Sequence, residues 1–454
     1  MLELMRNFGL TLTIVTICLG IILLTVGKIV PTGDLFVLSK TTDVEPEIKN
    51  SGEGIDPQID FTNPILKDPQ LKVEKVADGL DFSTSMAFMG PNHIIVLERT
   101  KGTVQSIVNG SIQKSALLDV PVNHVNGRGM LGVATARDEN SDRTFVFLYF
   151  TLSSTSEDSY NLTEEFGNRL YRYELNENKL VNPKLLLNIP AFSTKGDGGH
   201  NGGKLLIGPD QYLYLTVGDL RERKTMAQNN RSGLPPDGTS VIYRLTQDGD
   251  PAPGNPFGNI TSVSKFYAYG IRNSFGIDFD PLTGNLWDTE NGPEYGDEIN
   301  LVEPGFNSGW KRQMGFSVNS FYPDEFTNIG SSGNSGKYSD PEFVWNLPVA
   351  PTALKFLTSD KLGTQYRNDM FIGDALYGNI YHFDLKKNRT SLAIYTPLAD
   401  KIADNMGELE RLIFGQGLGR ITDLVVGPDG YLYILTNNMD LQGAIFRIVP
   451  VTKS

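Results

Sequence analysis

Short apolar runs, interrupted every few positions by Gly, Asn, Asp or Pro, dominate the chain from Leu71 to its end. This pattern is typical of β-strands that are joined by tight turns. No long amphipathic helical period interrupts it, and glycine is abundant at 47 residues, which suits a fold built of turns and short strands. We therefore expect a single all-β domain over 71–454.

Two units recur in this region, always in the same order. The first, a turn followed by an apolar strand, occurs at Gly208–Asp219 and Gly427–Asn438, with looser copies at Phe279–Glu290 and Met89–Arg99. The second, a short strand with a central aromatic residue, occurs at Arg169–Leu175, Val241–Leu245, Asn379–Phe383 and Ala444–Ile448. We interpret each pair as the two middle strands of a four-stranded sheet. Repetition of such sheets predicts a β-propeller, and the length suits six blades of roughly 60 residues.

An apolar run from Phe8 to Gly27 precedes this domain and is about as long as a segment that spans a bilayer. Arg6 comes before it and several acidic residues follow it, which favours a cytoplasmic N-terminus and an exported body. We expect an uncleaved transmembrane anchor over 1–30, with a cleaved signal as the alternative, and a flexible acidic linker over 31–70. The predicted location is the cell membrane, with one pass and the propeller facing outside.

The charge and cysteine content narrow the classes of partner and of stabilisation. The formal net charge is -13, which argues against a nucleic-acid partner because such a partner requires a basic face. The single cysteine, Cys18, lies inside the apolar N-terminal run, so the chain can form no intrachain disulfide. The propeller must therefore be stabilised by its core and by any bound metal.

The stretch from Phe266 to Trp310 predicts a hairpin with polar groups gathered at one end. Arg272 and Asn273 come just before its first strand, and Gly292 and Pro293 come just after its second. A hairpin brings these outer ends together, along with the carboxylates Asp297 and Glu298. Such oxygens bind calcium, and a guanidinium binds carboxylates. The alternative interpretation is a tight turn with surface charges.

Four histidines are present, and His200 stands out because glycines surround it on both sides. A glycine-rich loop lets a ligand approach closely, and a histidine is the usual general base near neutral pH. Asp219 ends the strand that follows and can orient the imidazole if the two segments border one channel. The alternative is a histidine that caps a loop. We interpret the remaining histidines as packing, loop or surface residues: His93, His124 and His382.

Three segments resemble motifs of the soluble quinoprotein glucose/sorbosone dehydrogenases: His200–Asp219, Tyr269–Gly276 and Glu290–Trp310. The resemblance covers the chain from about Leu71 to Pro450. It implies a six-bladed propeller, in agreement with the repeats. It also implies oxidation of an aldose at its anomeric hydroxyl, with pyrroloquinoline quinone (PQQ) and calcium held in the central channel.

Carried over by position, the resemblance implies a catalytic role for three residues. His200 falls on the general base, Asp219 on the carboxylate that supports it, and Arg272 on the arginine beside the quinone. In that role His200 takes the proton of the sugar hydroxyl, and Arg272 stabilises negative charge on the cofactor.

The resemblance also implies a set of cofactor and metal ligands. Asn273 and Arg420 fall on positions that contact the quinone. The backbone carbonyls of Gly292 and Pro293 fall on the calcium ligands.

The quinone-binding positions depart from the family pattern at three places. Leu376 stands where the family has a lysine, and Thr422 stands where it has a second C-terminal arginine. A glutamine of the early glycine-rich motif is also missing, but Arg128 lies next to its position. Each charge-assisted bond to a carboxylate contributes roughly 1.5–3 kcal/mol, so we expect weaker quinone binding unless Arg128 compensates.

The predicted function is PQQ- and calcium-dependent oxidation of an aldose to its lactone on the outer cell surface. The expected partners are a sugar, the membrane and an electron acceptor that the sequence does not identify. One alternative is a quinone-free surface propeller that binds carbohydrate or protein. Another is a calcium-dependent hydrolase that uses the same His/Asp pair.

Overall fold

The computed structural model describes residues 64–138, 141–162, 167–191, 199–221, 223–317, 326–330, 336–437 and 442–451. The predicted anchor over 1–30 and most of the predicted linker over 31–70 lie outside these residues. Among the residues described, no helix is long and apolar enough to cross a membrane. The sheets begin earlier than residue 71, because β1 (Ile65–Leu66) already pairs with β26 (Ile413–Gln416).

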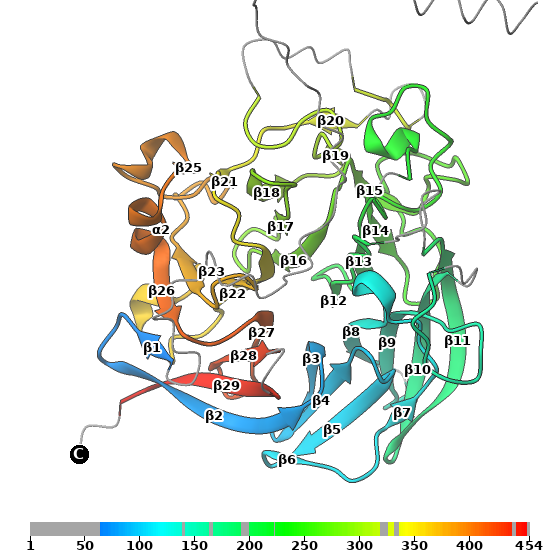
Figure 1. Cartoon of the computed structure of the whole chain (residues 1–454), viewed down its shortest axis with the longest axis horizontal. Helices are drawn as coiled ribbons and strands as arrows, with labels where there is room; N and C mark the ends of the chain where they lie inside the picture. The colour runs from blue at the N-terminus through cyan, green and yellow to red at the C-terminus, as the bar shows by residue number, and fades with distance from the viewer. Residues whose placement is uncertain are drawn as a thin grey trace, which may run out of the picture. The chain divides into compact units, whose positions relative to one another are not determined.

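The strands of the described residues form six sheets arranged around an axis (Figure 1). The first sheet contains β3 (Ser83–Gly90), β4 (His93–Glu98), β5 (Thr103–Val108), β6 (Ser111–Ile112) and β7 (Leu118–Asp119). The second contains β8 (Met130–Arg137), β9 (Thr144–Thr151), β10 (Asn168–Asn176) and β11 (Lys179–Ile189). The third contains β12 (Leu205–Ile207), β13 (Leu213–Val217), β14 (Val241–Leu245), β15 (Phe266–Tyr269), β19 (Phe306–Asn307) and β20 (Lys337–Tyr338).

The remaining three sheets complete the ring. The fourth contains β16 (Ser274–Phe279), β17 (Leu286–Glu290), β18 (Asp297–Val302), β21 (Phe343–Trp345) and β25 (Ile402–Ala403). The fifth contains β22 (Pro351–Phe356), β23 (Met370–Asp374), β24 (Ile380–Phe383), β26 and β1, and the helix α2 (Met406–Leu412) lies between β25 and β26 in the chain. The sixth contains β27 (Ile421–Val426), β28 (Leu432–Thr436), β29 (Gly443–Pro450) and β2 (Leu71–Leu80).

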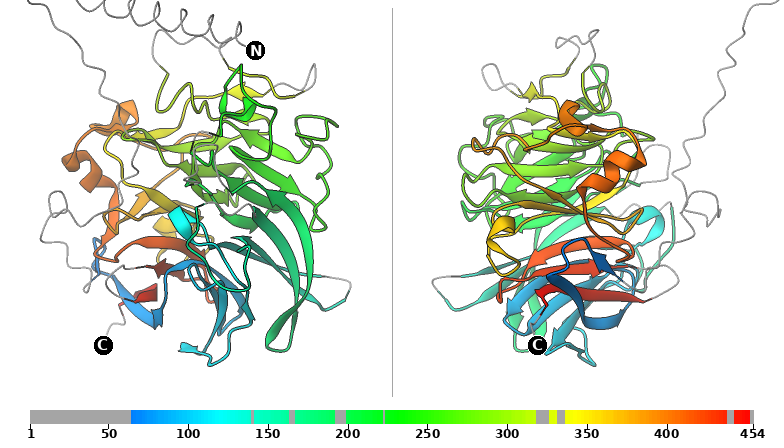
Figure 2. Two further views of the ribbon diagram at one scale, coloured as in Figure 1. Left: turned by 45° about the vertical axis from the view of Figure 1, so that its right-hand side comes forward. Right: turned by 90° about the vertical axis from the view of Figure 1, so that its left-hand side faces the viewer.

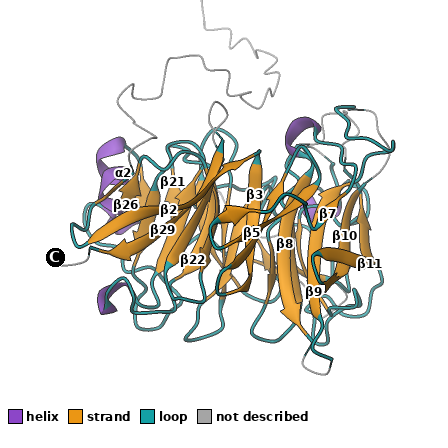
Figure 3. Ribbon diagram, turned by 90° about the horizontal axis from the view of Figure 1, so that it is seen from below, coloured by secondary structure: helices purple, strands orange, loops and turns teal. Residues whose placement is uncertain are grey.

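The ring closes through contacts between the sheets and through one strand from the other end of the chain. β3 contacts β8, and β8 contacts β12 of the third sheet. From that sheet β13 contacts β16, β16 contacts β22, β22 contacts β27, and β27 contacts β3 again. β2 pairs with β29, so the beginning of the domain completes the sheet formed by its end. Figure 2 and Figure 3 show the same stacked sheets from the side. The prediction of an all-β propeller is confirmed.

The two recurring units are the middle strands of their sheets, as predicted. β13 pairs with β14, β23 with β24, and β28 with β29, each between an inner and an outer strand. All residues of β13, β23 and β28 are buried, because a propeller sheet is covered on both faces by its neighbours. This burial explains why these strands read as continuous apolar runs rather than alternating ones.

The repetition of the sheets positions the candidate site. Because the sheets repeat by rotation about the axis, their first strands run in the same direction and begin at the same face. Arg128 precedes β8, His200 precedes β12, Arg272 precedes β16 and Arg420 precedes β27. Each sheet's second strand runs back and ends at that face, as β13 does just before Asp219. The topology therefore brings residues that are far apart in the sequence to one rim of the ring.

Candidate active site

Two segments from neighbouring sheets meet at Gly218. The backbone N–H of Asp219 donates to the carbonyl oxygen of Arg272 at 2.9 Å. A Cβ atom at Gly218 would lie 2.3 Å from the carbonyl oxygen of His200 and 2.7 Å from that of Arg272. Such distances are too short for any side chain, so glycine at this position allows His200, Asp219 and Arg272 to converge.

The imidazole of His200 is bound to Asp219, as the sequence analysis anticipated. His200 Nδ1 lies 2.7 Å from Asp219 Oδ1, and the two residues are only 7% and 2% exposed. The other carboxylate oxygen accepts from Trp310 Nε1 at 2.7 Å, and Oδ1 also accepts from the backbone N–H of Arg221 at 2.9 Å. Burial alone would raise the pKa of Asp219, but His200, Arg272 and Trp310 outweigh it and hold the pKa below its ordinary value.

The geometry defines how His200 can act on a proton. Because the carboxylate of Asp219 accepts only, it places the proton of a neutral imidazole on Nδ1 and the lone pair on Nε2. His200 has φ of +58°, a left-handed conformation that is uncommon for residues other than glycine. Such conformations cluster at functional sites.

Arg272 is held from several directions beside this pair. Its backbone N–H donates to Glu290 Oε1 at 2.5 Å, and its Nη1 donates to the carbonyl oxygen of Asn291 at 2.9 Å. The guanidinium carbon lies 5.3 Å from the centre of the Trp310 ring, within the range of a cation–π contact. We name His200, Asp219, Arg272 and Trp310 the imidazole group.

Asn273 links the same sheets on the other side of Arg272. Its Oδ1 accepts from the backbone N–H of Gly202 at 3.3 Å, and its carbonyl oxygen accepts from the backbone N–H of Asn291 at 3.0 Å. Asn273 is 7% exposed, and its two hydrogen bonds join the His200 loop to the hairpin.

The predicted hairpin is present, and its outer ends meet. Ser274 of β16 pairs with Glu290 of β17, which brings Arg272 and Gly292 to one end of the sheet. Gly292 donates its N–H to Asp297 Oδ1 at 2.8 Å. The other oxygen of Asp297 accepts from the N–H groups of Val349 at 2.7 Å and Ala350 at 2.8 Å. Asp297 therefore fixes the turn.

The Gly292–Pro293 turn offers two backbone carbonyl oxygens, the kind of ligand that a hard cation prefers. Among the residues described, no hydrogen bond ends on the carbonyl oxygen of Gly292 or Pro293. Gly292 is buried and Pro293 is exposed, so the turn lies at the edge of the protein interior. Carbonyl oxygens without a protein donor fit a calcium ion.

Three buried carboxylates, those of Asp288, Glu290 and Glu298, lie on the strands β17 and β18, which flank the turn. Glu290 pairs with Glu298, and Asp288 pairs with Asn300, so the side chains share one face of the sheet. Burial raises the pKa of Asp288 to about 7 and that of Glu290 to about 8, and it raises the pKa of Glu298 well above its ordinary value. Ser308 Oγ donates to Glu290 at 2.6 Å. The sequence analysis anticipated Glu298 at this end of the hairpin but not Asp288 and Glu290.

A second group of cations comes from the sheets across the ring. Arg99 directly follows β4, and its Nη1 donates to the carbonyl oxygen of Arg128 at 3.3 Å. Burial lowers the pKa of Arg99, and the nearby positive charge of Arg420 lowers it further. Arg128 is only 1% exposed. We name Arg99, Arg128 and Arg420 the arginine group, and its closely placed positive charges suit an anionic ligand.

Leu376 and Thr422 stand where the family has a lysine and an arginine, and they bring no positive charge to this rim. Leu376 is half-buried, and its backbone N–H donates to the carbonyl oxygen of Val349 at 3.3 Å. Thr422 lies on β27 and donates from Oγ1 to the carbonyl oxygen of Leu435 at 3.4 Å. Arg420 is joined to the neighbouring strand, because its carbonyl oxygen accepts from Asn437 N–H at 2.8 Å.

Two members of these groups, Arg99 and Trp310, were not predicted as site residues. Each was visible only as part of a repeat or a motif. Arg99 ends the same recurring unit that ends at Asp219, so the repeat alignment alone would have placed it at the rim. No sequence signal pairs Trp310 with Asp219, because 91 residues separate them and the contact depends on the ring.

The structure is a β-propeller with a buried histidine–aspartate pair, which can move a proton, and with arginines at the same rim, which can bind an anionic group. The chain matches the model of the family described as "Glucose / Sorbosone dehydrogenase" over residues 80–447. It therefore belongs to this family of oxidoreductases, and its relatives include sugar dehydrogenases.

Two curated relatives illustrate the family. The chain is 27% identical over 384 residues to aldose sugar dehydrogenase YliI of Escherichia coli, which covers 84% of this chain and 93% of the relative. It is 30% identical over 263 residues to quinoprotein glucose dehydrogenase B of Acinetobacter calcoaceticus, over 54% of this chain and 53% of the relative.

Solved structures share the fold. The soluble aldose sugar dehydrogenase of Escherichia coli, in its apo form, matches with a TM-score of 0.63 at 24% identity, over 84% of this chain and 100% of that chain. The PQQ-bound aldose sugar dehydrogenase of Streptomyces coelicolor matches with a TM-score of 0.60 at 24% identity, over 84% and 99%.

Proposed function

We propose that this protein oxidises an aldose at its anomeric hydroxyl with PQQ and calcium. The observation that carries the proposal is the His200–Asp219 pair, joined at 2.7 Å and held at the rim of the ring beside Arg272. The family supports oxidation of a sugar, and two similar proteins are described as a quinoprotein and as PQQ-bound.

His200 acts as the general base in this proposal. Asp219 holds the imidazole so that Nε2 can take the proton of the sugar hydroxyl, and it stabilises the imidazolium that forms. Trp310 holds the other oxygen of Asp219, so the carboxylate cannot rotate away from the ring. PQQ, when bound, supplies the acceptor for the hydride.

The residues present fit the calcium ion and PQQ in part. The carbonyl oxygens of Gly292 and Pro293 would hold the calcium ion, since no donor among the described residues satisfies them. Arg272 and the arginine group would hold the carboxylates of the quinone, with Asn273 beside it. Leu376 and Thr422 contribute no charge, so this binding relies on Arg99 and Arg128 more than the family pattern implies.

We also propose the wider setting of the reaction. Each of the six sheets corresponds to one blade of a six-bladed ring, because each has its own inner strand in the closed ring. The apolar run in 1–30 would anchor the chain in the cell membrane with the propeller outside. Electrons would pass to an acceptor that remains to be identified.

The experiment is reconstitution of the purified protein with PQQ and calcium, followed by a panel of aldoses. We expect saturable PQQ binding, measured by tryptophan fluorescence. Addition of a sugar should reduce the quinone, as seen in its absorption spectrum, and should reduce an artificial dye. His93→Gln is the matched control, because His93 begins β4, at the opposite end of that strand from Arg99, and its ring bonds to Ser106. If the wild type fails to bind PQQ at micromolar concentrations, the proposal is wrong and the quinone-free binding propeller takes its place.

Leu376→Lys provides a second test of the same proposal. A lysine at this position would give a quinone carboxylate a charge-assisted partner, worth roughly 1.5–3 kcal/mol. We expect the PQQ dissociation constant to fall about tenfold or more in a fluorescence titration, with Leu376→Met as the uncharged control. Equal affinities of the two variants would mean that Leu376 does not face the quinone.

A further inference from the structure

The outer faces of two sheets carry the same three-residue arrangement. In the third sheet, Tyr214 of β13 pairs across the strands with Arg244 of β14, and both bind Asp210 in the preceding turn, at 2.9 Å each. Arg244 also lies 4.5 Å above the ring of Tyr212. In this arrangement a permanently charged arginine neutralises one aspartate.

The sixth sheet repeats the arrangement residue for residue. Tyr433 of β28 pairs with Arg447 of β29, and Tyr433 donates to Asp429 at 2.9 Å. Arg447 forms an ion pair with the same aspartate at 3.4 Å. The repeated unit is therefore a tyrosine, an arginine and the aspartate of the turn.

The fifth sheet replaces every member of this unit. Phe371 of β23 and His382 of β24 take the paired positions of the tyrosine and the arginine. Asp369 directly precedes β23, two residues before Phe371, where the other two sheets have Tyr212 and Tyr431. Asp384 follows His382 by two residues, and the corresponding positions elsewhere are Thr246 and Val449. One imidazole thus faces two carboxylates here, where the third and sixth sheets place a permanently charged guanidinium, which in the sixth sheet also pairs with Glu74.

These side chains converge at the distances of a metal site. His382 Nε2 lies 3.0 Å from Asp369 Oδ2 and 3.6 Å from Asp384 Oδ1, and one ligand atom from each residue lies within 4.8 Å of the others. Ligand atoms around a tetrahedral zinc ion with bonds of about 2.0–2.1 Å are separated by roughly 3.3 Å. The two measured distances bracket that separation, so little movement would be needed to bind a metal.

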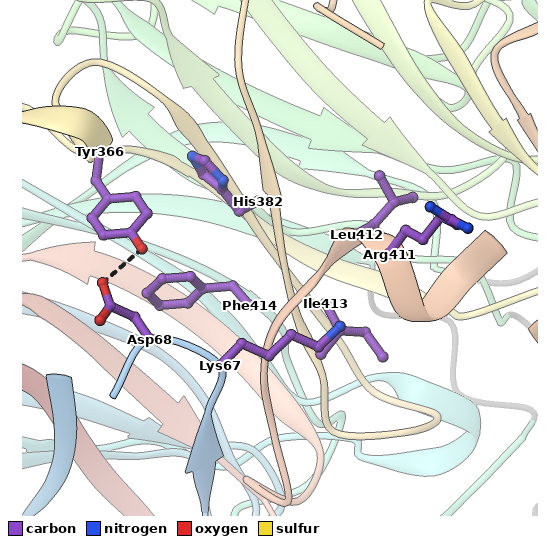
Figure 4. Close-up of a pocket in the computed structure, with 8 residues that line it drawn as sticks. All are labelled: Lys67, Asp68, Tyr366, His382, Arg411, Leu412, Ile413 and Phe414. Atoms are coloured by element: carbon purple, nitrogen blue, oxygen red, sulfur yellow. Dashed lines mark hydrogen bonds between the residues drawn. The ribbon is translucent and has the colours of Figure 1, made fainter. Parts of the chain in front are cut away.

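The imidazole is held in place by aromatic rings. Its centre lies 5.3 Å from the Tyr366 ring at 83° and 5.0 Å from the Phe371 ring at 36°. Figure 4 shows His382 beside Tyr366 and Phe414. All three line a cavity of about 270 Å³. The Asp384 side chain is 59% exposed, so an ion can enter from solvent. Fixed ligands reduce the entropy that binding would cost.

We propose that Asp369, His382 and Asp384 bind a divalent transition-metal ion, with Zn²⁺ as the best match. Imidazole suits zinc, cobalt and nickel, whereas calcium takes oxygen ligands alone. The site lies on an outer part of the fifth sheet, on residues that the sugar reaction does not use. It is therefore a second metal site, distinct from the calcium site proposed at Gly292 and Pro293, and it does not depend on the proposed reaction.

The test is a titration of the chelator-stripped full-length protein with Co²⁺, which reports on its ligands through visible absorption. We expect one saturable equivalent of Co²⁺, displacement by Zn²⁺ but not by Ca²⁺, and a higher melting temperature with Zn²⁺. His382→Arg is the decisive variant, because it restores the arginine of the other sheets and so preserves the fold. We expect it to lose the Co²⁺ spectrum and the Zn²⁺-induced shift.

Two control variants separate this site from the remaining histidines. His124→Gln and His200→Gln should bind Co²⁺ as the wild type does, since neither residue belongs to the cluster. The proposal is overturned if the wild type shows no saturable Co²⁺ binding, or if His382→Arg binds Co²⁺ as tightly as the wild type. Loss of binding in His200→Gln alone would assign the metal to the active site instead.

Discussion

The imidazole group and the arginine group lie on different sheets of the same ring. The surroundings favour the charged form of Asp219 in the first group and disfavour the charged form of Arg99 in the second. In the imidazole group, Asp219 is surrounded by His200, Arg272 and Trp310, and its pKa is lowered although it is buried. In the arginine group, Arg99 is half-buried near another cation, Arg420, and its pKa is lowered as well. Lowering the pKa favours the charged form of an acid and disfavours that of a base.

This difference indicates that the two groups suit different roles. A buried carboxylate with positive and hydrogen-bonding partners is stable without any addition. Guanidinium groups that lie close together repel each other, and an anion bound beside them would relieve that repulsion. We infer that the imidazole group is preorganised for proton transfer, whereas the arginine group is preorganised for an anionic cofactor.

The sharpest way to test the comparison is His200→Ala. A general base contributes about 10²–10⁴-fold to the rate, so we expect kcat for aldose oxidation to fall by that factor. PQQ affinity should change by less than about twofold, because the arginine group is intact and a base is not needed for binding. Dye reduction and tryptophan fluorescence measure the two quantities. A variant that keeps its turnover would remove His200 from the chemistry.

Asp219→Asn tests whether the carboxylate acts through the imidazole. The amide keeps the shape but cannot stabilise an imidazolium, so we expect kcat to fall roughly 10–100-fold with an unchanged fold. Asp219→Glu, which keeps the charge, should recover part of the activity. A pH profile of kcat distinguishes this role from a structural one, since loss of packing alone would scale the profile without changing its form.

Arg420→Met tests the arginine group. It removes one positive charge while keeping the length of the side chain, so we expect PQQ affinity to fall about tenfold. At saturating PQQ, kcat should equal that of the wild type, because the imidazole group is untouched. Fluorescence titration and dye reduction on the same sample measure both. A lower kcat with unchanged affinity would contradict the division into two groups.

A buried aspartate without a cation beside it gives the smallest effect. Burial raises the pKa of Asp374 to about 7, although Tyr381 and the N–H groups of Tyr377 and Gly378 donate to it. A raised pKa means that the folded state binds the proton more tightly than the unfolded state. The stability that this adds is complete below about pH 4 and is lost as the pH rises through about 7.

Asp374→Asn should therefore reduce the pH dependence of unfolding. Between pH 6 and 7 we expect the free energy of unfolding to change by about 1 kcal/mol less in the variant than in the wild type. Denaturant titrations at the two pH values provide the measurement. Asp237→Asn, on a partly exposed aspartate, is the control, and an equal slope in both variants would show that Asp374 is not the titrating group.

The fold could be predicted from the sequence because each sheet repeats a local pattern. The unit at Gly208–Asp219 combines a turn that requires glycine with a strand that is buried on both faces, and both features depend only on nearby residues. The hairpin from Phe266 to Trp310 was predicted for the same reason, and its ends meet as expected. The predicted boundary at residue 71 missed β1, because its pairing with β26 joins segments that are far apart in the sequence.

The sequence alone determined which residues are chemically capable: a histidine among glycines, the Gly218–Asp219 dipeptide, and arginines placed before strands. Closure of the ring decided which of them meet. The Trp310–Asp219 bond, the proximity of Arg99 to Arg420 and the stacking of acids on β17 and β18 join sheets or strands whose spacing no local period encodes. Charges at such sites are set by burial and by neighbours across the ring, and both exist only once the sheets have packed.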